Sequence, residues 1–199
     1  MINKRLQDFK IILASQSSRR HYLLKELGLD FEIISTDVRE EYPDILTPPE
    51  IATFLAEKKA ESIDTLRMEE KMIIIAADTI VSLEGEILGK PGNYEEALTM
   101  LKKLSGKQHD VITGVCIKSR DKKILFHVSS KVYFKELCDD EIDYYITNFK
   151  PYDKAGGYGI QEWIGYIGIS KLEGSFFNVM GLPVKEVYEE LLKNYSYLC

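Results

Sequence analysis

The fold is indicated most directly by residues 71–88, KMIIIAADTIVSLEGEIL. Lys71 to Ala77 is an apolar run of strand length, typical of a strand buried on both faces of a sheet. Ile80–Leu83 and Glu86–Leu88 then flank Glu84-Gly85, a turn signal that predicts a β-hairpin. One stretch therefore combines a fully buried strand with an antiparallel pair, which predicts a mixed sheet.

Helices and strands alternate outward from this stretch. Before it we expect a strand at 10–14, a helix from Ser17 or Ser18 to about Leu27, a strand at 31–35, and a helix opened by the capping-box spacing of 47–50 and running to about Met68. After it we expect helices at 94–106 and 139–149, strands at 110–118 and 123–135, a hairpin of 165–172 with 175–179, and a last helix from Pro183. The prediction is an α/β fold with a mixed β-sheet flanked by helices, in a single domain over 1–199.

Composition and charge argue against nucleic-acid and membrane partners. The 199 residues are 45% hydrophobic, enough to bury a core, and carry a net charge of −6, which argues against nucleic acid as the main partner. No apolar stretch approaches the roughly 20 residues of a membrane span, so no membrane partner is expected. Three cysteines without short spacing and the lack of a secretory signal indicate a soluble, cytoplasmic protein.

Residues 11–20, IILASQSSRR, combine a strand, a serine-rich turn and a helix start. Free backbone N–H groups at a helix N-terminus bind anions. Arg19 and Arg20 fall in the first helical turn, where the helix dipole disfavours cations, and a bound anion would offset that cost. The alternative is ordinary serine capping beside two solvated arginines.

Asp78 and Lys90 are two further candidates. Asp78 follows a buried strand, where a carboxylate can bind Mg²⁺ or accept a proton from water, although an aspartate in a turn is the commoner case. Lys90 lies in a Gly-Pro turn and either contacts phosphate or is simply solvated.

Residues 153–161, DKAGGYGIQ, form a glycine-rich stretch. Its glycines allow positive φ and close approach to a ligand. Gln161 offers one acceptor and two donors, enough to read the edge of uracil or thymine. A flexible surface turn is the alternative interpretation.

Six motifs in this order resemble the Maf family of nucleoside triphosphate pyrophosphatases: LASQSSRR, AADTIV, LGKP, LSGKQHDVITGV, DKAGGYGIQ and VMGLPV. The resemblance implies an inosine-triphosphatase-like α/β fold with an elongated mixed β-sheet flanked by helices and two lobes around a cleft. Three positions depart from the usual family pattern: Ser18 replaces a proline, Gly157 an alanine, and Glu162-Trp163 follow Gln161 where a glycine is usual.

The resemblance also implies roles for individual residues. Those assigned to phosphate or catalysis are Ser15, Arg19 and Arg20 on the phosphate-binding turn, Glu40 as the metal-associated acid, Lys59 reaching the triphosphate, Asp78 as proton acceptor and metal ligand, and Lys90 as a second essential lysine. Those linked to base choice are Arg19, Thr79 and Gln161.

The expected activity is hydrolysis of dTTP and UTP to the monophosphate and pyrophosphate, with Mg²⁺ or Mn²⁺ as cofactor. The family also includes enzymes that prefer 7-methyl-GTP and has been linked with regulation of cell division, and an inosine or xanthosine triphosphatase would share the chemistry. The resemblance further implies a possible homodimer.

Overall fold

The computed structural model of this chain describes residues 2–63 and 70–195. Within it the chain forms two compact units. The first unit comprises Met1–Asp78, Thr113–Val128 and Gly181–Cys199, and the second comprises Thr79–Ile112 and Ser129–Met180. Three long strands contribute residues to both units.

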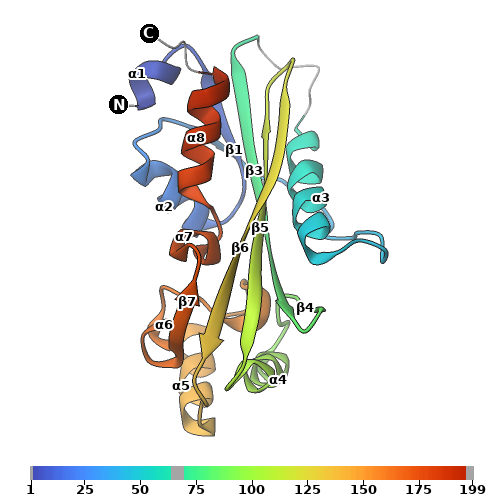
Figure 1. Cartoon of the computed structure of the whole chain (residues 1–199), viewed down its shortest axis with the longest axis vertical. Coiled ribbons are helices and arrows are strands. Elements are labelled where there is room, and N and C mark those ends of the chain that lie inside the picture. The colour runs from blue at the N-terminus through green and yellow to red at the C-terminus, as the bar shows by residue number, and fades with distance from the viewer. Residues whose placement is uncertain (1, 64–69, 196–199) are drawn as a thin grey trace. The chain divides into compact units, whose positions relative to one another are not determined.

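Seven strands form one mixed sheet in the order β2-β1-β3-β5-β6-β7, with β4 paired to β3 off this path (Figure 1). The strands are β1 (Lys10–Ala14), β2 (Glu32–Ile34), β3 (Met72–Leu83), β4 (Glu86–Leu88), β5 (Gln108–Lys118), β6 (Lys123–Phe134) and β7 (Ile169–Glu173). β1 is parallel to β2 and β3, whereas β4 and β7 run antiparallel to β3 and β6. The predicted mixed α/β fold is confirmed.

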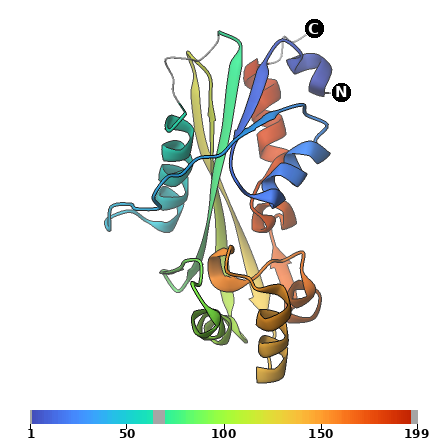
Figure 2. The same ribbon diagram turned by 180° about the vertical axis from the view of Figure 1, so that it is seen from behind.

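In the first unit, helices cover both faces of the strands. They are α1 (Ile2–Leu6), α2 (Ser18–Glu26), α3 (Pro48–Glu61) and α8 (Val184–Tyr195). Figures 1 and 2 show α3 on one side of the strands, with α2 and α8 on the other. On the α3 side, Ala56 and Ala60 pack against Met72, Ile74 and Ala76, alternate residues of β3. Asp78 is the next alternate residue of β3 after Ala76, so its side chain also points toward α3.

A close approach of α3 to β5 depends on Gly114. A Cβ at this position would lie 2.2 Å from the carbonyl carbon of Ala52 and 2.4 Å from the backbone nitrogen of Thr53. Both contacts are far below van der Waals distance and involve helix backbone, so only glycine lets α3 lie this close.

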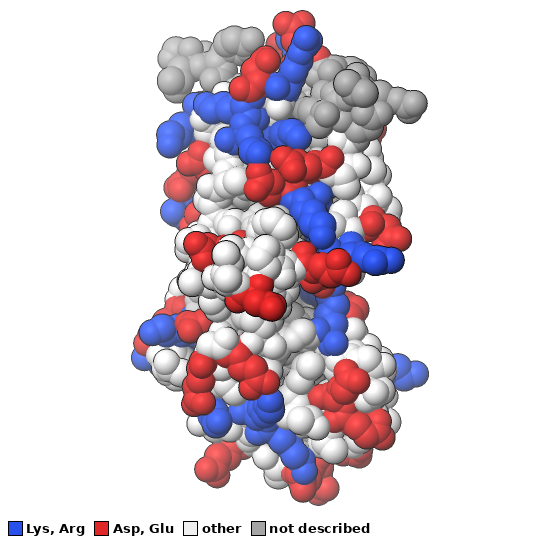
Figure 3. All heavy atoms as spheres, turned by 90° about the vertical axis from the view of Figure 1, so that its right-hand side faces the viewer, with Lys and Arg blue, Asp and Glu red and all other residues white. Residues whose placement is uncertain are grey.

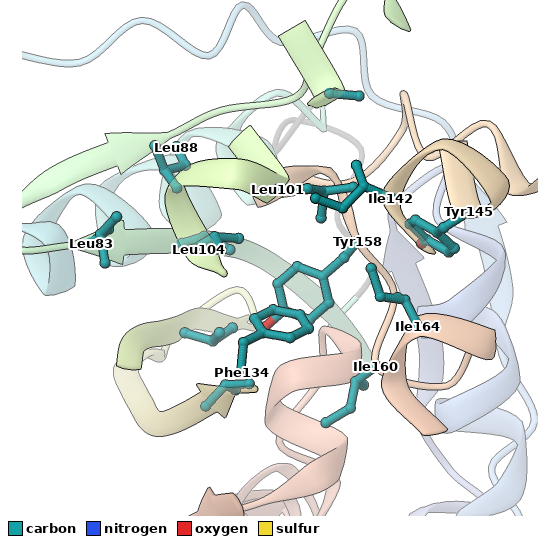
Figure 4. Close-up of a cluster of buried hydrophobic side chains, with 14 of the residues drawn as sticks. Leu83, Leu88, Leu101, Leu104, Phe134, Ile142, Tyr145, Tyr158, Ile160 and Ile164 are labelled. Atoms are coloured by element: carbon teal, nitrogen blue, oxygen red, sulfur yellow. The ribbon is translucent and has the colours of Figure 1, made fainter. Parts of the chain in front are cut away.

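The second unit has its own core of side chains from several helices and strands (Figure 4). Its helices are α4 (Tyr94–Leu104), α5 (Asp139–Phe149), the 3₁₀ turn η2 (Ala155–Gly157), α6 (Trp163–Gly168) and α7 (Phe176–Met180). Figure 4 shows Tyr158 beside Phe134, whose ring centroids are 5.1 Å apart, with Tyr145 elsewhere in the same cluster. Tyr158 thus anchors the glycine-rich stretch in this core.

The predicted hairpin of 165–172 with 175–179 is wrong. Trp163–Gly168 is helical, only Ile169–Glu173 is a strand, and Phe176–Met180 is a second short helix. Short apolar runs do not distinguish helix from strand by periodicity. Tertiary packing decides here: a Cβ on Gly165 would lie 1.9 Å from the carbonyl oxygen of Ile160, so the chain turns tightly at this glycine.

Further differences from the prediction concern β3, α3 and α1. β3 continues unbroken through Asp78, which therefore lies inside a strand rather than at its end. α3 ends at Glu61, with Ser62 as its C-cap, while the expected extension reaches residues outside the described ranges. α1 has no counterpart in the prediction, because its five residues are too few for a periodic signal.

Acidic and basic side chains are interspersed on the face viewed in Figure 3. One ion-paired cluster lies beside α3, where Lys123 contacts Glu57 and, at 3.2 Å, Glu61. Among the described helices, none is long and apolar enough to cross a membrane.

Candidate functional site

Three charged residues of the first unit meet at one point. The Lys59 ammonium forms an ion pair with Asp78 and lies 3.3 Å from Oε1 of Glu40. The side chains of Asp78 and Lys59 are only 7% and 12% exposed, whereas that of Glu40 is 40% exposed. The largely buried Lys59 ammonium therefore contacts one buried carboxylate, that of Asp78, and one solvent-exposed carboxylate, that of Glu40.

Three different segments bring these residues together. Asp78 lies on β3, Lys59 is in the last turn of α3, and Glu40 belongs to the loop that precedes this helix. The loop ends where Thr47 donates its backbone N–H to Oε2 of Glu50 at 2.8 Å, so the predicted capping box fixes the start of α3.

Lys58 holds the loop that carries Glu40. Its ammonium donates to the carbonyl oxygens of Arg39, at 2.9 Å, and Glu41, at 3.3 Å. These two residues flank Glu40, so the interaction fixes the backbone on both sides of that acid. Sequence reasoning missed this role, since a lysine on an amphipathic helix usually faces water.

Arg20 adds a cation to the same region. Its Nε donates to the carbonyl oxygen of Gly181 at 2.7 Å, which links the LASQSSRR motif to the VMGLPV motif. Burial lowers the pKa of the Arg20 guanidinium, the carboxylates of Asp78 and Glu40 act in the opposite direction, and Arg19 adds to the lowering. Arginine stays charged in proteins, so Arg20 remains a cation.

Hydrogen bonds between nearby residues hold the serine-rich turn before α2. Ser15 is buried, its hydroxyl accepts the backbone N–H of Ser17 at 3.1 Å, and its carbonyl oxygen lies 2.8 Å from Nε2 of His21. The N-cap Ser17 makes no side-chain capping bond within the described part of the chain. The first N–H groups of α2 are thus not capped by that side chain, which suits an anion site. The role of His21 in this turn was not anticipated.

The donor set fits a hard divalent cation. Both carboxylates approach one ammonium, so a cation could take their oxygens together. Mg²⁺ is commonly held by one or two carboxylates, with water and substrate phosphate completing its shell. Over residues 2–63 and 70–195, no group of three or more His, Cys, Asp or Glu side chains could hold a metal ion. Asp78 and Glu40 are the pair that could do so in part.

The remaining predicted site residues, Thr79, Lys90 and Gln161, belong to the second unit. The Gly156 N–H donates to the Gly89 carbonyl oxygen at 3.0 Å, so the Lys90 turn and the glycine-rich stretch lie side by side in this unit. Lys90 is exposed. Oε1 of Gln161 is buried without a hydrogen-bond partner among the described residues, and such an acceptor is costly unless a ligand satisfies it.

These features define an α/β protein with a cluster of cations and acids beside a helix N-terminus. The sequence model of the family described as Maf-like protein matches residues 10–194, so the chain belongs to the Maf-like family.

Several curated relatives cover almost the whole chain. A protein of Parabacteroides distasonis is 51% identical over 94% of this chain and 96% of its own length. One of Flavobacterium johnsoniae is 50% identical over 96% and 98%, and one of Phocaeicola vulgatus is 52% identical over 94% and 97%. All three are named dTTP/UTP pyrophosphatase. Among solved structures, the Ham1 protein of Staphylococcus aureus matches with a TM-score of 0.43 and 18% identity, over 63% of this chain and 71% of that chain.

Proposed function

We propose that this chain is a nucleoside triphosphate pyrophosphatase that hydrolyses dTTP and UTP to the monophosphate and pyrophosphate and so removes nucleotides from the pool. The names of relatives at about 50% identity over nearly the full length support the reaction and the substrates. The observation that carries the proposal is the Lys59 ammonium between Asp78 and Glu40, with Arg20 beside them. Two cations beside one buried and one solvent-open acid suit phosphoanhydride hydrolysis.

The cations would bind the triphosphate. Arg19 and Arg20 lie in the first turn of α2, and Lys59 contacts both acids. Lys90 is proposed as a further phosphate-binding lysine. Their fixed positive charges would stabilise the charge that grows on the phosphate oxygens in the transition state. When the ammonium of Lys59 turns to the triphosphate, the Asp78 carboxylate is released from its ion pair.

Asp78 would then hold the attacking water. Its carboxylate would accept a hydrogen bond, and finally a proton, from the water as this attacks the α-phosphorus, while the bond from that phosphorus to the bridging oxygen breaks. Pyrophosphate leaves with the electron pair of that bond. A Mg²⁺ or Mn²⁺ ion held by Asp78 and Glu40 would supply Lewis-acid stabilisation of phosphate oxygens.

Gln161, Thr79 and Arg19 are proposed to select the base. The buried Oε1 of Gln161 can accept the N3–H of uracil or thymine, and its amide N–H groups can donate to a ring carbonyl. Cytosine has no proton on N3, so at that ring position it offers Oε1 no donor. The cytoplasmic location and the homodimer stay predictions.

A nucleotide panel tests this function. UTP, dTTP, CTP, 7-methyl-GTP and ITP are each incubated with Mg²⁺, with Mn²⁺ or with a chelator, and ³¹P NMR distinguishes monophosphate plus pyrophosphate from diphosphate plus phosphate. We expect UTP and dTTP to be preferred, and chelation to stop turnover. Release of inorganic phosphate, or a preference for 7-methyl-GTP or ITP, would contradict the proposal. Binding of nucleotides without turnover would favour a regulatory role instead.

A further inference from the structure

A polar network in the second unit includes Glu162, the residue that follows Gln161. The ammonium of Lys154 lies 3.0 Å from Oε1 of Glu162 and 2.7 Å from Oδ1 of Asp153. The hydroxyl of Tyr145 donates to Oε2 of Glu162 and accepts the backbone N–H of Gly159 at 3.0 Å. Tyr145 is fully buried, and the side chains of Lys154 and Glu162 are 9% and 20% exposed.

This network explains one departure from the family pattern. An acidic residue directly after Gln161 could have added negative charge where a base is read. Instead, both oxygens of Glu162 are engaged by Lys154 and Tyr145. Burial, together with the Glu162 carboxylate, raises the pKa of Tyr145, so its hydroxyl stays protonated and keeps donating.

Members of the network pack against the backbone of Gly159 in the glycine-rich stretch. A Cβ on Gly159 would lie 2.8 Å from Cδ of Glu162 and 3.0 Å from Cε of Lys154. The backbone N–H of Glu162 donates to the Gly159 carbonyl oxygen at 3.0 Å. Both polar backbone groups of Gly159 therefore bond to members of the network, and its missing side chain makes room for the ion pair.

Gln161 sits between fixed neighbours. On one side Ile160 is 6% exposed in the core of the second unit, and on the other Glu162 is held by Lys154 and Tyr145. Within the described residues, Oε1 of Gln161 has no partner of its own. The backbone at 160–162 thus sets the point from which the Gln161 side chain projects, and an acceptor held in place discriminates better than a mobile one.

We propose that Lys154, Glu162 and Tyr145 are positioning residues that set base discrimination by fixing the backbone on either side of Gln161. This inference rests on the proposed function for the identity of the base. The three residues act through Gln161 and do not themselves bind the nucleotide. Removing one of them should loosen the 159–162 segment and weaken the preference for UTP over CTP.

Tyr145→Phe is the mildest test, because it removes one oxygen and keeps the buried ring. Its matched control is Tyr94→Phe, which deletes a tyrosine hydroxyl that donates to another carboxylate of the second unit, Asp143, at 2.7 Å. Amide hydrogen exchange at Gly159 and the ratio of kcat/KM for UTP and CTP are measured in both. We expect about tenfold faster exchange and about tenfold lower discrimination in Tyr145→Phe, mainly through a higher KM for UTP. Tyr94→Phe should match the wild type.

A second pair of variants distinguishes loss of the hydrogen bond to Tyr145 from a general loss of folding. Glu162→Gln keeps an oxygen for the Tyr145 hydroxyl, whereas Glu162→Ala keeps none, so we expect the glutamine variant to retain more of the discrimination. Unchanged exchange and discrimination in Tyr145→Phe would overturn the inference, as would equal losses of kcat/KM for UTP and CTP. Failure of the proposed function is recognised separately, because the wild type itself would not release pyrophosphate from UTP. The exchange at Gly159 would still decide in that case whether the network fixes this segment.

Discussion

Lys59 forms an ion pair with Asp78 although the two lie 19 positions apart, on a helix and on a strand. Glu40, another 19 positions before Lys59, contacts the same ammonium at 3.3 Å. The lysine is mostly buried, so each carboxylate offsets part of the cost of desolvating it. On the proposed function, this ammonium would exchange one of its acid partners for a phosphate of the substrate.

Asp78→Asn should abolish turnover while leaving nucleotide binding largely intact. Asparagine keeps the shape and an oxygen for Lys59, but cannot accept a proton. We expect kcat for dTTP to fall at least about hundredfold, measured as pyrophosphate release, with little change in Kd from calorimetry. Asp143→Asn, at an exposed aspartate of α5, serves as control. Near-normal turnover in Asp78→Asn would remove Asp78 from the chemistry.

Lys58→Met should impair catalysis through Glu40. The variant loses the bonds to the carbonyl oxygens of Arg39 and Glu41, which frees the loop between them. We expect kcat to fall on the order of tenfold, since a catalytic group displaced by about 1 Å can cost more than that. Steady-state kinetics on dTTP are the measurement.

Lys123→Met is the control for this variant, because Lys123 pairs with Glu57 and Glu61 of the same helix but not with the loop. A matching loss of kcat in both lysine variants would indicate a general effect on α3 and contradict the role of Lys58.

Gly114→Ala should destabilise the fold. The new Cβ would overlap the backbone of Ala52 and Thr53, so α3 would have to move away from β5. Overpacking of this kind costs about 1–3 kcal/mol, measured here by urea unfolding. At Gly89 a Cβ would meet nothing within 4 Å, so Gly89→Ala is the control for stability. Equal stability of the two variants would show that α3 has room to shift.

His109 should make stability depend on pH. Burial lowers its pKa from 6.5 to about 4, and its Nε2 lies 2.7 Å from the Tyr158 hydroxyl. Between these pH values the unfolded chain binds the proton and the folded chain does not. The free energy of unfolding therefore falls as pH drops from 6.5 toward 4, by up to about 3 kcal/mol from this group.

Urea unfolding at pH 7.5 and pH 5 measures this effect. His109→Asn should lose less stability over that interval than the wild type, whereas His127→Asn, at an exposed histidine, should lose as much as the wild type. An unchanged pH dependence in His109→Asn would contradict the assignment.

Local signals in the sequence were sufficient for much of the fold. The apolar run of β3, the Thr47 cap of α3 and the turn at Glu84-Gly85 each depend on neighbouring residues, and each was predicted. The segment from Trp163 to Met180 was not, because its short apolar runs suit either helix or strand and distant contacts made the choice.

By itself, the sequence determined most of the strand and helix pattern, the family motifs and the residue types available for phosphate chemistry. Each of these features depends on residues that lie close together in the chain. Tertiary structure alone decided that Lys59 meets Asp78 and Glu40, that Lys58 holds the loop between Arg39 and Glu41, and that the Glu162 carboxylate is turned to Lys154 and Tyr145. The physical reason is that electrostatic contacts act between atoms brought close by packing. Such proximity depends on how helices and strands dock, which in the case of Lys59 and Asp78 includes a glycine on β5 that neither residue adjoins in sequence.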